Sequence, residues 1–340
     1  MAFADFLTDR KVDFTPLIET VAPIDTLVSN LGLFDTYNHA TTNIRVDRDT
    51  TSQALIPSRQ RGGERNWLTT PGLEGVAVTI PFFPLDHNIK AQDFQSFLDF
   101  MNPEADNLTT QEVVVTRYLN QIRRNVAYTK ERILTDAVKG SQYVGVDPIT
   151  GFANQNQNYN WYDVFGVEQY EVAVDFTSTT VDPTEVIESQ VRGYIIDTKG
   201  DGSSVTNIVA LCGRQFFSNI ISSPFVRSAF VYWQGQPNPI RDRIGGNIDA
   251  RVWSFKGVTY VEDIYGSIGA NEAYVFPEGI PNMFQQHFAP ADAYQYANEQ
   301  AQDFYLFMIA TDWRTLSMQS EFGMLAVNTR PELVVHLTTA

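Results

Sequence analysis

The strongest pattern of apolar positions predicts a long helix over residues 110–139. Its apolar residues recur at intervals of three and four, as they do on one face of an α-helix. They are Val115, Leu119, Ile122, Val126, Ile133 and Ala137. Gly140 follows in the position that commonly ends a helix. About 30 residues at 1.5 Å each give a length of about 45 Å, so we expect a spine helix on which other elements are mounted.

Strand and helix patterns alternate after this helix. Apolar and polar residues alternate over 168–180, as in a half-buried strand. Asp182 and Pro183 suit the cap and the first position of a second helix. Further predicted elements are, in order, a strand over 207–211, a helix from Arg214, a hairpin from Arg251 to Ile264 that turns at Lys256-Gly257, and a strand over 333–338. This mixture predicts an α+β fold.

The first 85 residues have a different character. Residues 1–50 carry scattered apolar side chains without a sustained period, which predicts an arm laid over other surfaces. Residues 51–85 are rich in Gly, Pro, Thr and Arg. Strand-like runs at 54–56 and 76–80 flank Gly-Gly and Pro-Gly turn signals there. We therefore expect a long two-stranded projection over 51–85.

Composition and charge exclude several classes of protein. The 340 residues are 43% hydrophobic, which is enough for one or two ordinary cores. The 40 acidic and 24 basic residues give a formal net charge of −16, which argues against a nucleic-acid reader. The chain has no run of apolar residues long enough for a membrane helix and no basic start of a signal peptide. We expect a chain that neither spans a membrane nor is exported by that route.

Sequence motifs for catalysis or cofactor binding are missing. The chain has no phosphate-binding, dinucleotide-binding, zinc-protease or nucleophile-elbow motif. Cys212 ends an apolar strand and is interpreted as a buried, inert thiol. Adjacent residues on a strand face opposite ways, so Glu262 and Asp263 cannot flank one bond. We interpret the four histidines as ordinary packed or surface residues; they are His39, His87, His287 and His336.

We therefore expect no catalytic residue, no metal and no cofactor. One alternative stays open, namely an acidic enzyme of the glycoside hydrolase type, because carboxylates from distant segments can come together in a fold.

One basic cluster lies on the predicted projection. Arg59, Arg61 and Arg65 fall within seven residues, beside Glu64 and Trp67. One interpretation is a solvated loop. The other is that these guanidinium groups reach an acidic neighbouring subunit and form bidentate pairs with its carboxylates. A chain of net charge −16 offers such partners, and both interpretations remain open.

Five stretches along nearly the whole chain share their order with a known family. They are Ser58-Arg-Gln-Arg61-Gly-Gly63 through Pro71-Gly72, Ala137-Val-Lys-Gly140, Val252-Trp-Ser-Phe-Lys256-Gly257, Val275-Phe-Pro277-Glu-Gly279, and Trp313 through Pro331-Glu-Leu-Val-Val335. In this order and spacing, the sequence resembles the major capsid proteins of lambda-like tailed phages, the capsid protein E family.

The resemblance implies the Hong Kong 97 (HK97)-like capsid fold. It divides the chain into residues 1–50 as the N-terminal arm, 51–85 as the extended loop, 86–180 as the peripheral domain with the spine helix, 181–312 as the axial domain and 313–340 as a C-terminal return to the peripheral and axial core. The implied role is structural, without catalysis. Copies of the chain would self-assemble as pentamers and hexamers into an icosahedral head shell that encloses double-stranded DNA.

The resemblance also implies partners and a location. The partners are other copies of the chain, a portal at one vertex, a decoration protein and a scaffolding protein, with no membrane and no sequence-specific DNA binding. The shell belongs to the virion and is assembled in the host cytoplasm. The chain shows no scaffolding domain before the arm, so we expect a separately encoded scaffold.

The extended loop departs from some members of this fold. Those members lock the mature shell with lysine–asparagine isopeptide bonds from a lysine on that loop. This chain has no lysine between Lys11 and Lys90, so we expect a non-covalent shell. A shell protein of a cellular nanocompartment is a further alternative, which the resemblance to the lambda-like family disfavours.

Overall fold

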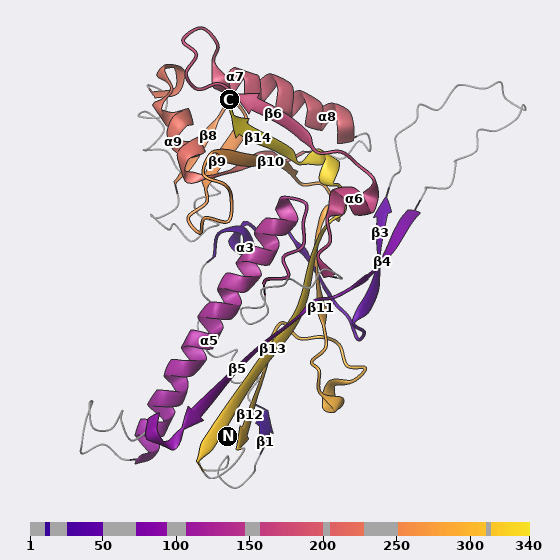
Figure 1. Ribbon diagram of the computed structural model, residues 1–340. Coiled ribbons are helices and arrows are strands. Elements are labelled where there is room, and N and C mark those ends of the chain that lie inside the picture. Colours follow the sequence, from indigo (N-terminus) through magenta and orange to yellow (C-terminus); the bar gives the residue numbers. More distant parts are fainter. Residues whose placement is uncertain are drawn as a thin grey trace, which may run out of the picture.

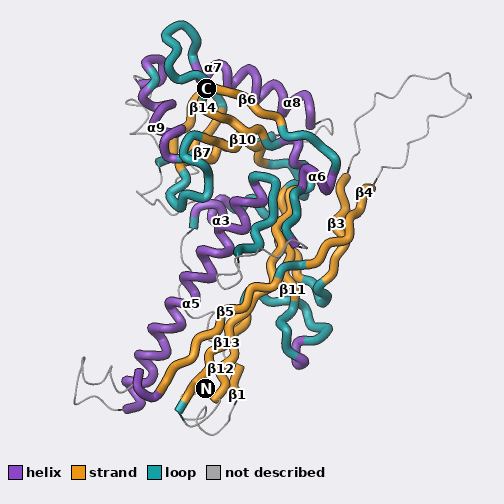
Figure 2. The backbone as a smooth tube through the Cα atoms, in the orientation of Figure 1, coloured by secondary structure: helices purple, strands orange, loops and turns teal. Residues whose placement is uncertain are grey.

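The computed structural model describes residues 11–13, 26–49, 73–93, 107–146, 157–199, 205–227, 251–310 and 314–340. These residues form two six-stranded sheets, a separate two-stranded ribbon and one long helix (Figure 1). We call the two six-stranded sheets the lower and the upper sheet, after their places in Figure 1. The long helix lies beside the lower sheet, and shorter helices lie around the upper sheet (Figure 2). The prediction of an α+β fold is confirmed.

The helix α5 (Asn107–Val138) corresponds to the predicted spine. All six of its predicted apolar positions are buried, and they share a core with Met318 and Phe322 of the lower sheet. After the helix ends, Gly140 takes a φ of 91°. A Cβ at that position would lie 2.2 Å from the ring of Tyr162. Glycine is therefore required where α5 stops.

The lower sheet is built on one long strand, β13. The first part of β13 lies between β12 and β5, and its last part pairs with β11. β1 pairs with β12 at one edge, and β2 pairs in parallel with β11 at the other. The strands are β1 (Lys11–Asp13), β2 (Asp35–Asn38), β5 (Phe82–Lys90), β11 (Phe284–Ala289), β12 (Tyr305–Ala310) and β13 (Thr315–Asn328).

The upper sheet is mixed, in the order β6-β14-β10-β7-β9-β8. Its core joins apolar residues of the strands with apolar residues of the helices, among them Ile187, Phe216 and Trp253. The strands are β6 (Tyr170–Val174), β7 (Asn207–Cys212), β8 (Val252–Phe255), β9 (Val258–Glu262), β10 (Glu272–Glu278) and β14 (Val335–Thr339). The helices are α7 (Pro183–Val186), a π-helical stretch (Ile187–Arg192), α8 (Gly193–Lys199) and α9 (Arg214–Ser222).

The ribbon pairs β3 (Asn43–Asp49) with β4 (Leu73–Thr79) in antiparallel fashion. In Figure 1 the short helix α6 (Trp161–Phe165) lies beside the end of the ribbon from which the loop leaves. β4 contains most of the predicted strand at 76–80, whereas the predicted strand at 54–56 lies outside the described residues. Two short 3-10 turns complete the fold, at Tyr294–Tyr296 and at Pro331–Leu333.

The short helix α3 (Leu27–Leu31) is fixed to α5 by a buried carboxylate. Glu131 accepts hydrogen bonds from the backbone N–H groups of Val28 at 2.6 Å and Ser29 at 3.1 Å. Burial raises the pKa of Glu131, and these backbone hydrogen bonds oppose that shift. The carboxylate satisfies N–H groups that a helix start leaves without partners. The segment before the ribbon is thereby attached to the spine helix.

Most elements with a local signal are confirmed. Asp182 caps α7 by accepting a hydrogen bond from the N–H of Thr184 at 2.9 Å. The hairpin of β8 and β9 turns at Lys256 and Gly257, both with positive φ, as a type I′ turn requires. The predicted strands at 168–180, 207–211 and 333–338 correspond to β6, β7 and β14. The sequence patterns did not predict β5 or the four strands from β10 to β13.

The strand pairing crosses two of the predicted domain boundaries. β6 precedes residue 181 but lies in the upper sheet, whereas β11 and β12 precede residue 313 but lie in the lower sheet. The division into arm, loop, peripheral and axial domains therefore stays a prediction. The pairing favours placing residues 284–310 with the part of the chain that holds α5.

Candidate subunit-interface site

The residues predicted to contact a neighbouring subunit lie outside the described residues. Arg59, Arg61, Glu64, Arg65 and Trp67 all belong to the segment between β3 and β4. Their role stays a prediction. The described structure does show how the two ends of this segment are held.

The base of the ribbon is anchored by one apolar face. Ile44 and Val46 of β3 and Val78 of β4 are buried in a core with Trp161 and Leu325. The intervening side chains of β3 are exposed, as the period of two in a strand requires. The backbone N–H of Thr79 also donates to the hydroxyl of Tyr159 at 2.9 Å. The ribbon therefore leaves the body of the molecule from a fixed base.

A charged group also ties the outer end of β3 to the body. Arg48 donates to the Glu332 carboxylate at 3.0 Å and to the carbonyl of Phe165 at 3.3 Å. The side chains of Arg48 and Glu332 are only 12% and 14% exposed. Arg330 lies 3.5 Å from the same carboxylate and donates to the carbonyl of Lys199 at 2.5 Å. Glu332 thus holds two arginines from different parts of the chain beside the exit of the loop.

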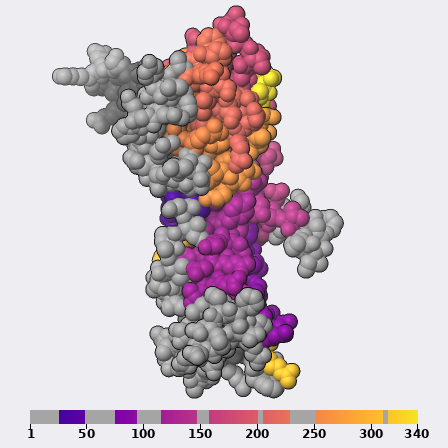
Figure 3. All heavy atoms as spheres, turned by 90° about the vertical axis from the view of Figure 1, so that its left-hand side faces the viewer, coloured from indigo at the N-terminus to yellow at the C-terminus, as the bar shows by residue number. Residues whose placement is uncertain are grey.

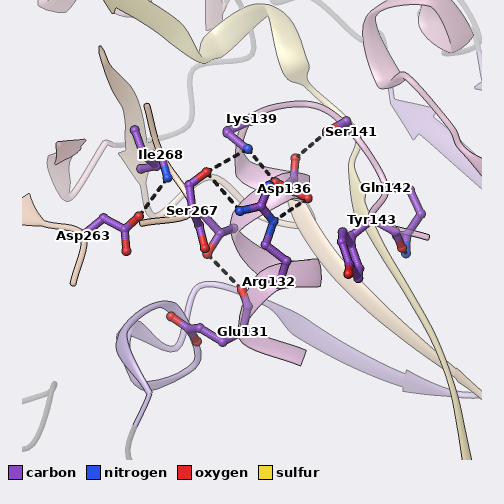
Figure 4. A network of polar contacts seen from close by, with 11 residues as sticks. Glu131, Arg132, Asp136, Lys139, Ser141, Gln142, Tyr143, Asp263, Ser267 and Ile268 are labelled. Atoms are coloured by element: carbon purple, nitrogen blue, oxygen red, sulfur yellow. Dashed lines mark hydrogen bonds and ion pairs between the residues drawn. The ribbon is translucent and has the colours of Figure 1, made fainter. Parts of the chain in front are cut away.

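A second polar network fixes the end of α5 to the upper sheet (Figure 4). Asp136 pairs with Arg132 at 3.0 Å and with Lys139 at 2.5 Å. Both cations also donate to the backbone carbonyl of Ser267, at 3.4 Å from Arg132 and 3.0 Å from Lys139. Asp263 holds the loop that carries this carbonyl, because it accepts from the backbone N–H of Ile268 at 2.8 Å. The spine helix and the upper sheet are joined by these contacts.

Glu262 and Asp263 serve different structural contacts, as expected for adjacent residues. Glu262 accepts two hydrogen bonds from Arg251, at 2.6 and 2.7 Å. The guanidinium of Arg251 in turn lies 4.9 Å from the ring centroid of Phe217. Glu262 therefore holds the start of the β8–β9 hairpin against α9. This arrangement does not bring the two carboxylates to one substrate bond.

Cys212 is fully buried in the core of the upper sheet. Burial, with a smaller contribution from the charge of Glu262, raises the pKa of its thiol. A thiol in this environment is a poor nucleophile. Among the described residues, no three His, Cys, Asp or Glu side chains gather as a metal site would require. No described helix is long and apolar enough to cross a membrane.

Two histidines that are far apart in sequence come into contact beside the lower sheet. His39 Nε2 and His287 Nδ1 lie 2.9 Å apart. His287 Nε2 lies 3.1 Å from Gln285 Oε1, and its ring stacks on Tyr37 with centroids 5.3 Å apart. Burial lowers the pKa of His39. Burial together with His39 lowers the pKa of His287 to about 4. No local signal could have predicted this pair, because 248 residues separate its members.

We expect the free energy of unfolding to fall as the pH is lowered from 6.5 towards about 4. The folded pKa of His287 lies below its ordinary value, so the unfolded chain binds more protons in this window and acid favours unfolding. The shift corresponds to about 3 kcal/mol at most, at 1.36 kcal/mol per pKa unit. Urea unfolding at several pH values measures the fall. The H287N variant should flatten the profile and H87N should retain it, whereas an equally steep profile in H287N would contradict the assignment.

Comparison with known proteins identifies the family. The family model described as phage major capsid protein E matches residues 12–339. The major capsid protein of Pseudomonas phage KPP10 is 27% identical over an alignment 347 positions long that covers 96% of each chain. That of Salmonella phage Felix O1 (isolate Felix O1-VT1) is 23% identical, covering 95% of this chain and 94% of its own.

A solved structure shares the fold. The crystal structure of a protein assigned as the capsid protein of a prophage of E. coli CFT073 aligns with a TM-score of 0.58 at 12% identity, covering 97% of this chain and 99% of its own. The described helices and strands, together with this match, show an HK97-like capsid fold. The chain belongs to the phage major capsid protein E family and is a structural subunit of the tailed-phage head shell.

Proposed function

We propose that copies of this chain assemble as pentamers and hexamers into the icosahedral shell of a phage head that encloses double-stranded DNA. The match of the capsid family model to residues 12–339 carries this proposal. The role is structural, with no catalytic step. Neither the glycoside hydrolase nor the nanocompartment alternative is favoured by the comparisons.

The anchored ribbon supports a role for the extended loop in assembly. Its strands are held by a buried apolar face and by the Arg48–Glu332 pair. The segment that joins them carries Arg59, Arg61 and Arg65. On a chain of net charge −16, these arginines can form bidentate pairs with carboxylates of the next subunit. Such contacts are weak singly and strong when each subunit makes several at once.

Reversing the charge of the loop should weaken assembly. The R59E/R61E/R65E variant places carboxylates where the proposed pairs need cations, so light scattering should show fewer pentamers, hexamers and shells than wild type. A matched control is R192E/R214E/R227E, which makes the same change in net charge at exposed arginines on and after the helices of the upper sheet. Equal assembly by the loop variant and the wild type would contradict the role of the loop.

The shell is expected to be non-covalent. The extended loop has no lysine between Lys11 and Lys90 that could form an isopeptide bond. Boiled mature particles should therefore release this chain as one band of 38.3 kDa on a denaturing gel. A heavier band that contains the chain and resists reductant would contradict this expectation.

The remaining partners follow from the proposed assembly. We propose a separately encoded scaffolding protein, a decoration protein that strengthens the non-covalent shell, and a portal at one vertex. Assembly takes place in the host cytoplasm and involves no membrane. Expression of the chain with and without candidate scaffolds tests the first of these partners, because uniform shells formed by the chain alone would refute a required scaffold.

A further inference from the structure

One face of α5 is turned away from the lower sheet and carries positive charge. The side chains of Arg117, Gln121, Arg124 and Tyr128 are exposed and recur at i, i+4, i+7 and i+11, so they lie in one row along the helix. We call these four residues the basic stripe. Figure 3 views the molecule from the side on which α5 lies in Figure 1, and atoms of α5 are at the surface there.

The charge of this region is opposite to that of the chain as a whole. Residues 113–130 contain four basic residues and no acidic one, in a chain with 40 acidic and 24 basic residues. Residues 161–199, by contrast, contain eight acidic and two basic residues. A local positive surface attracts anionic partners, even on a chain that is acidic as a whole.

The two arginines of the basic stripe form no ion pair within the described part of the chain. Neither Arg117 nor Arg124 forms an ion pair with any described residue. Further along α5 the charges are engaged, since Lys130 pairs with Asp303 and Glu131 holds α3. The stripe therefore ends before the part of α5 whose charged residues bind other elements.

We propose that the basic stripe contacts phosphate groups of the double-stranded DNA inside the shell. This inference rests on the proposed function, because it is the shell that brings DNA to the chain. Arg117 and Arg124 are seven residues apart, which is about 10.5 Å along the helix. That distance corresponds to about three steps along the DNA axis, at 3.4 Å of axis for each phosphate of one strand.

The chemistry of the basic stripe fits phosphate better than a base edge. Guanidinium groups bind phosphate in bidentate fashion, and the neighbouring amide and hydroxyl of Gln121 and Tyr128 can donate to phosphate oxygens. Two arginines on an otherwise acidic chain give a weak and salt-sensitive contact. Such a contact positions DNA near the shell without reading its sequence, and the surrounding acidic surface limits its strength.

The test is fluorescence anisotropy of a short, labelled DNA duplex of mixed sequence, titrated with the unassembled full chain over a series of low salt concentrations. The variant is R117Q/R124Q. Its matched control is R192Q/R214Q, which removes two exposed arginines and the same charge from the π-helical stretch before α8 and from α9. Because all four side chains are exposed or partly exposed, circular dichroism should show the same melting temperature in both variants.

We expect the wild type and the control to bind the duplex alike. R117Q/R124Q should bind more weakly, and the slope of log K against log salt should fall by about 1.8, at 0.9 for each lost phosphate contact. Absence of binding by the wild type, equal binding by R117Q/R124Q, or equal losses in both variants would overturn the proposal. So would unchanged DNA binding with loss of a co-purifying acidic protein from R117Q/R124Q, which would assign the basic stripe to that protein.

Shell formation by the same preparations separates this inference from the proposed function. If the wild type forms shells but the DNA test fails, only the proposal for the basic stripe is overturned. If the wild type fails to form shells with its phage partners, the proposed function is overturned, whatever the result of the DNA-binding test.

Discussion

Replacement of Trp161 by alanine is expected to lower the free energy of unfolding by about 3–5 kcal/mol, the usual cost of deleting a buried aromatic side chain. Trp161 is fully buried and stacks on Tyr159 and Phe165, with ring centroids 5.5 and 6.1 Å away. It supports the apolar face of both ribbon strands. The W161A variant should therefore also loosen the base of the extended loop and impair shell assembly.

The matched control for this variant is W253A. Trp253 is equally buried, but it lies in the core of the upper sheet with Tyr260. Both variants should lose a similar free energy of unfolding in urea. Hydrogen exchange should separate them, because the amides of β3 and β4 should lose protection in W161A and keep it in W253A. Equal protection of the ribbon in the two variants would contradict the anchoring role of Trp161.

The E332Q variant is expected to lower the free energy of unfolding by about 3 kcal/mol, near the lower end of the range for a buried ion pair that loses one partner. Glutamine keeps the size of the side chain but removes the negative charge. The guanidinium groups of Arg48 and Arg330 would then share a largely buried site without a counter-ion. The loss should appear in urea unfolding and as reduced protection at the outer end of β3.

The control for E332Q is D47N, on the same ribbon strand. Asp47 pairs with Arg45 at 2.6 Å, but these side chains are 48% and 64% exposed. An exposed pair contributes less than about 1 kcal/mol. If D47N and E332Q destabilise the chain equally, the buried pair does not anchor the loop.

Elements with a local signal could be predicted from the sequence. The apolar face of α5, the Asp182-Pro183 helix start and the Lys256-Gly257 turn each depend on residues only a few positions apart. The family resemblance added the type of fold, because it uses the order of segments along the chain. It is confirmed by the family model and by the shared structure.

The long strand β13 shows why other elements were missed. Its buried face includes Ser320, whose hydroxyl donates to the carbonyl of Leu85 at 2.5 Å. A polar residue on a buried face breaks the alternation that predicts a strand. Its partner lies 235 residues away in sequence, so only the folded sheet explains how serine is accommodated there.

The candidate interface also contains residues that the sequence could indicate and residues that only the fold brings together. The cluster of Arg59, Arg61 and Arg65 is visible in the sequence because its members are close together. The Arg48–Glu332 pair at the base of the loop joins residues 284 positions apart. Spacing alone could not single out either residue, and burial of the pair distinguishes it from the many exposed charges of this chain.

Electron microscopy of the purified full chain, expressed with its phage partners, tests the proposed shell most directly. We predict closed icosahedral shells, or free pentamers and hexamers, in which the subunit density fits the two sheets, the ribbon and α5. A homogeneous 38.3 kDa monomer in every preparation, with no ring or shell in any image, would contradict it.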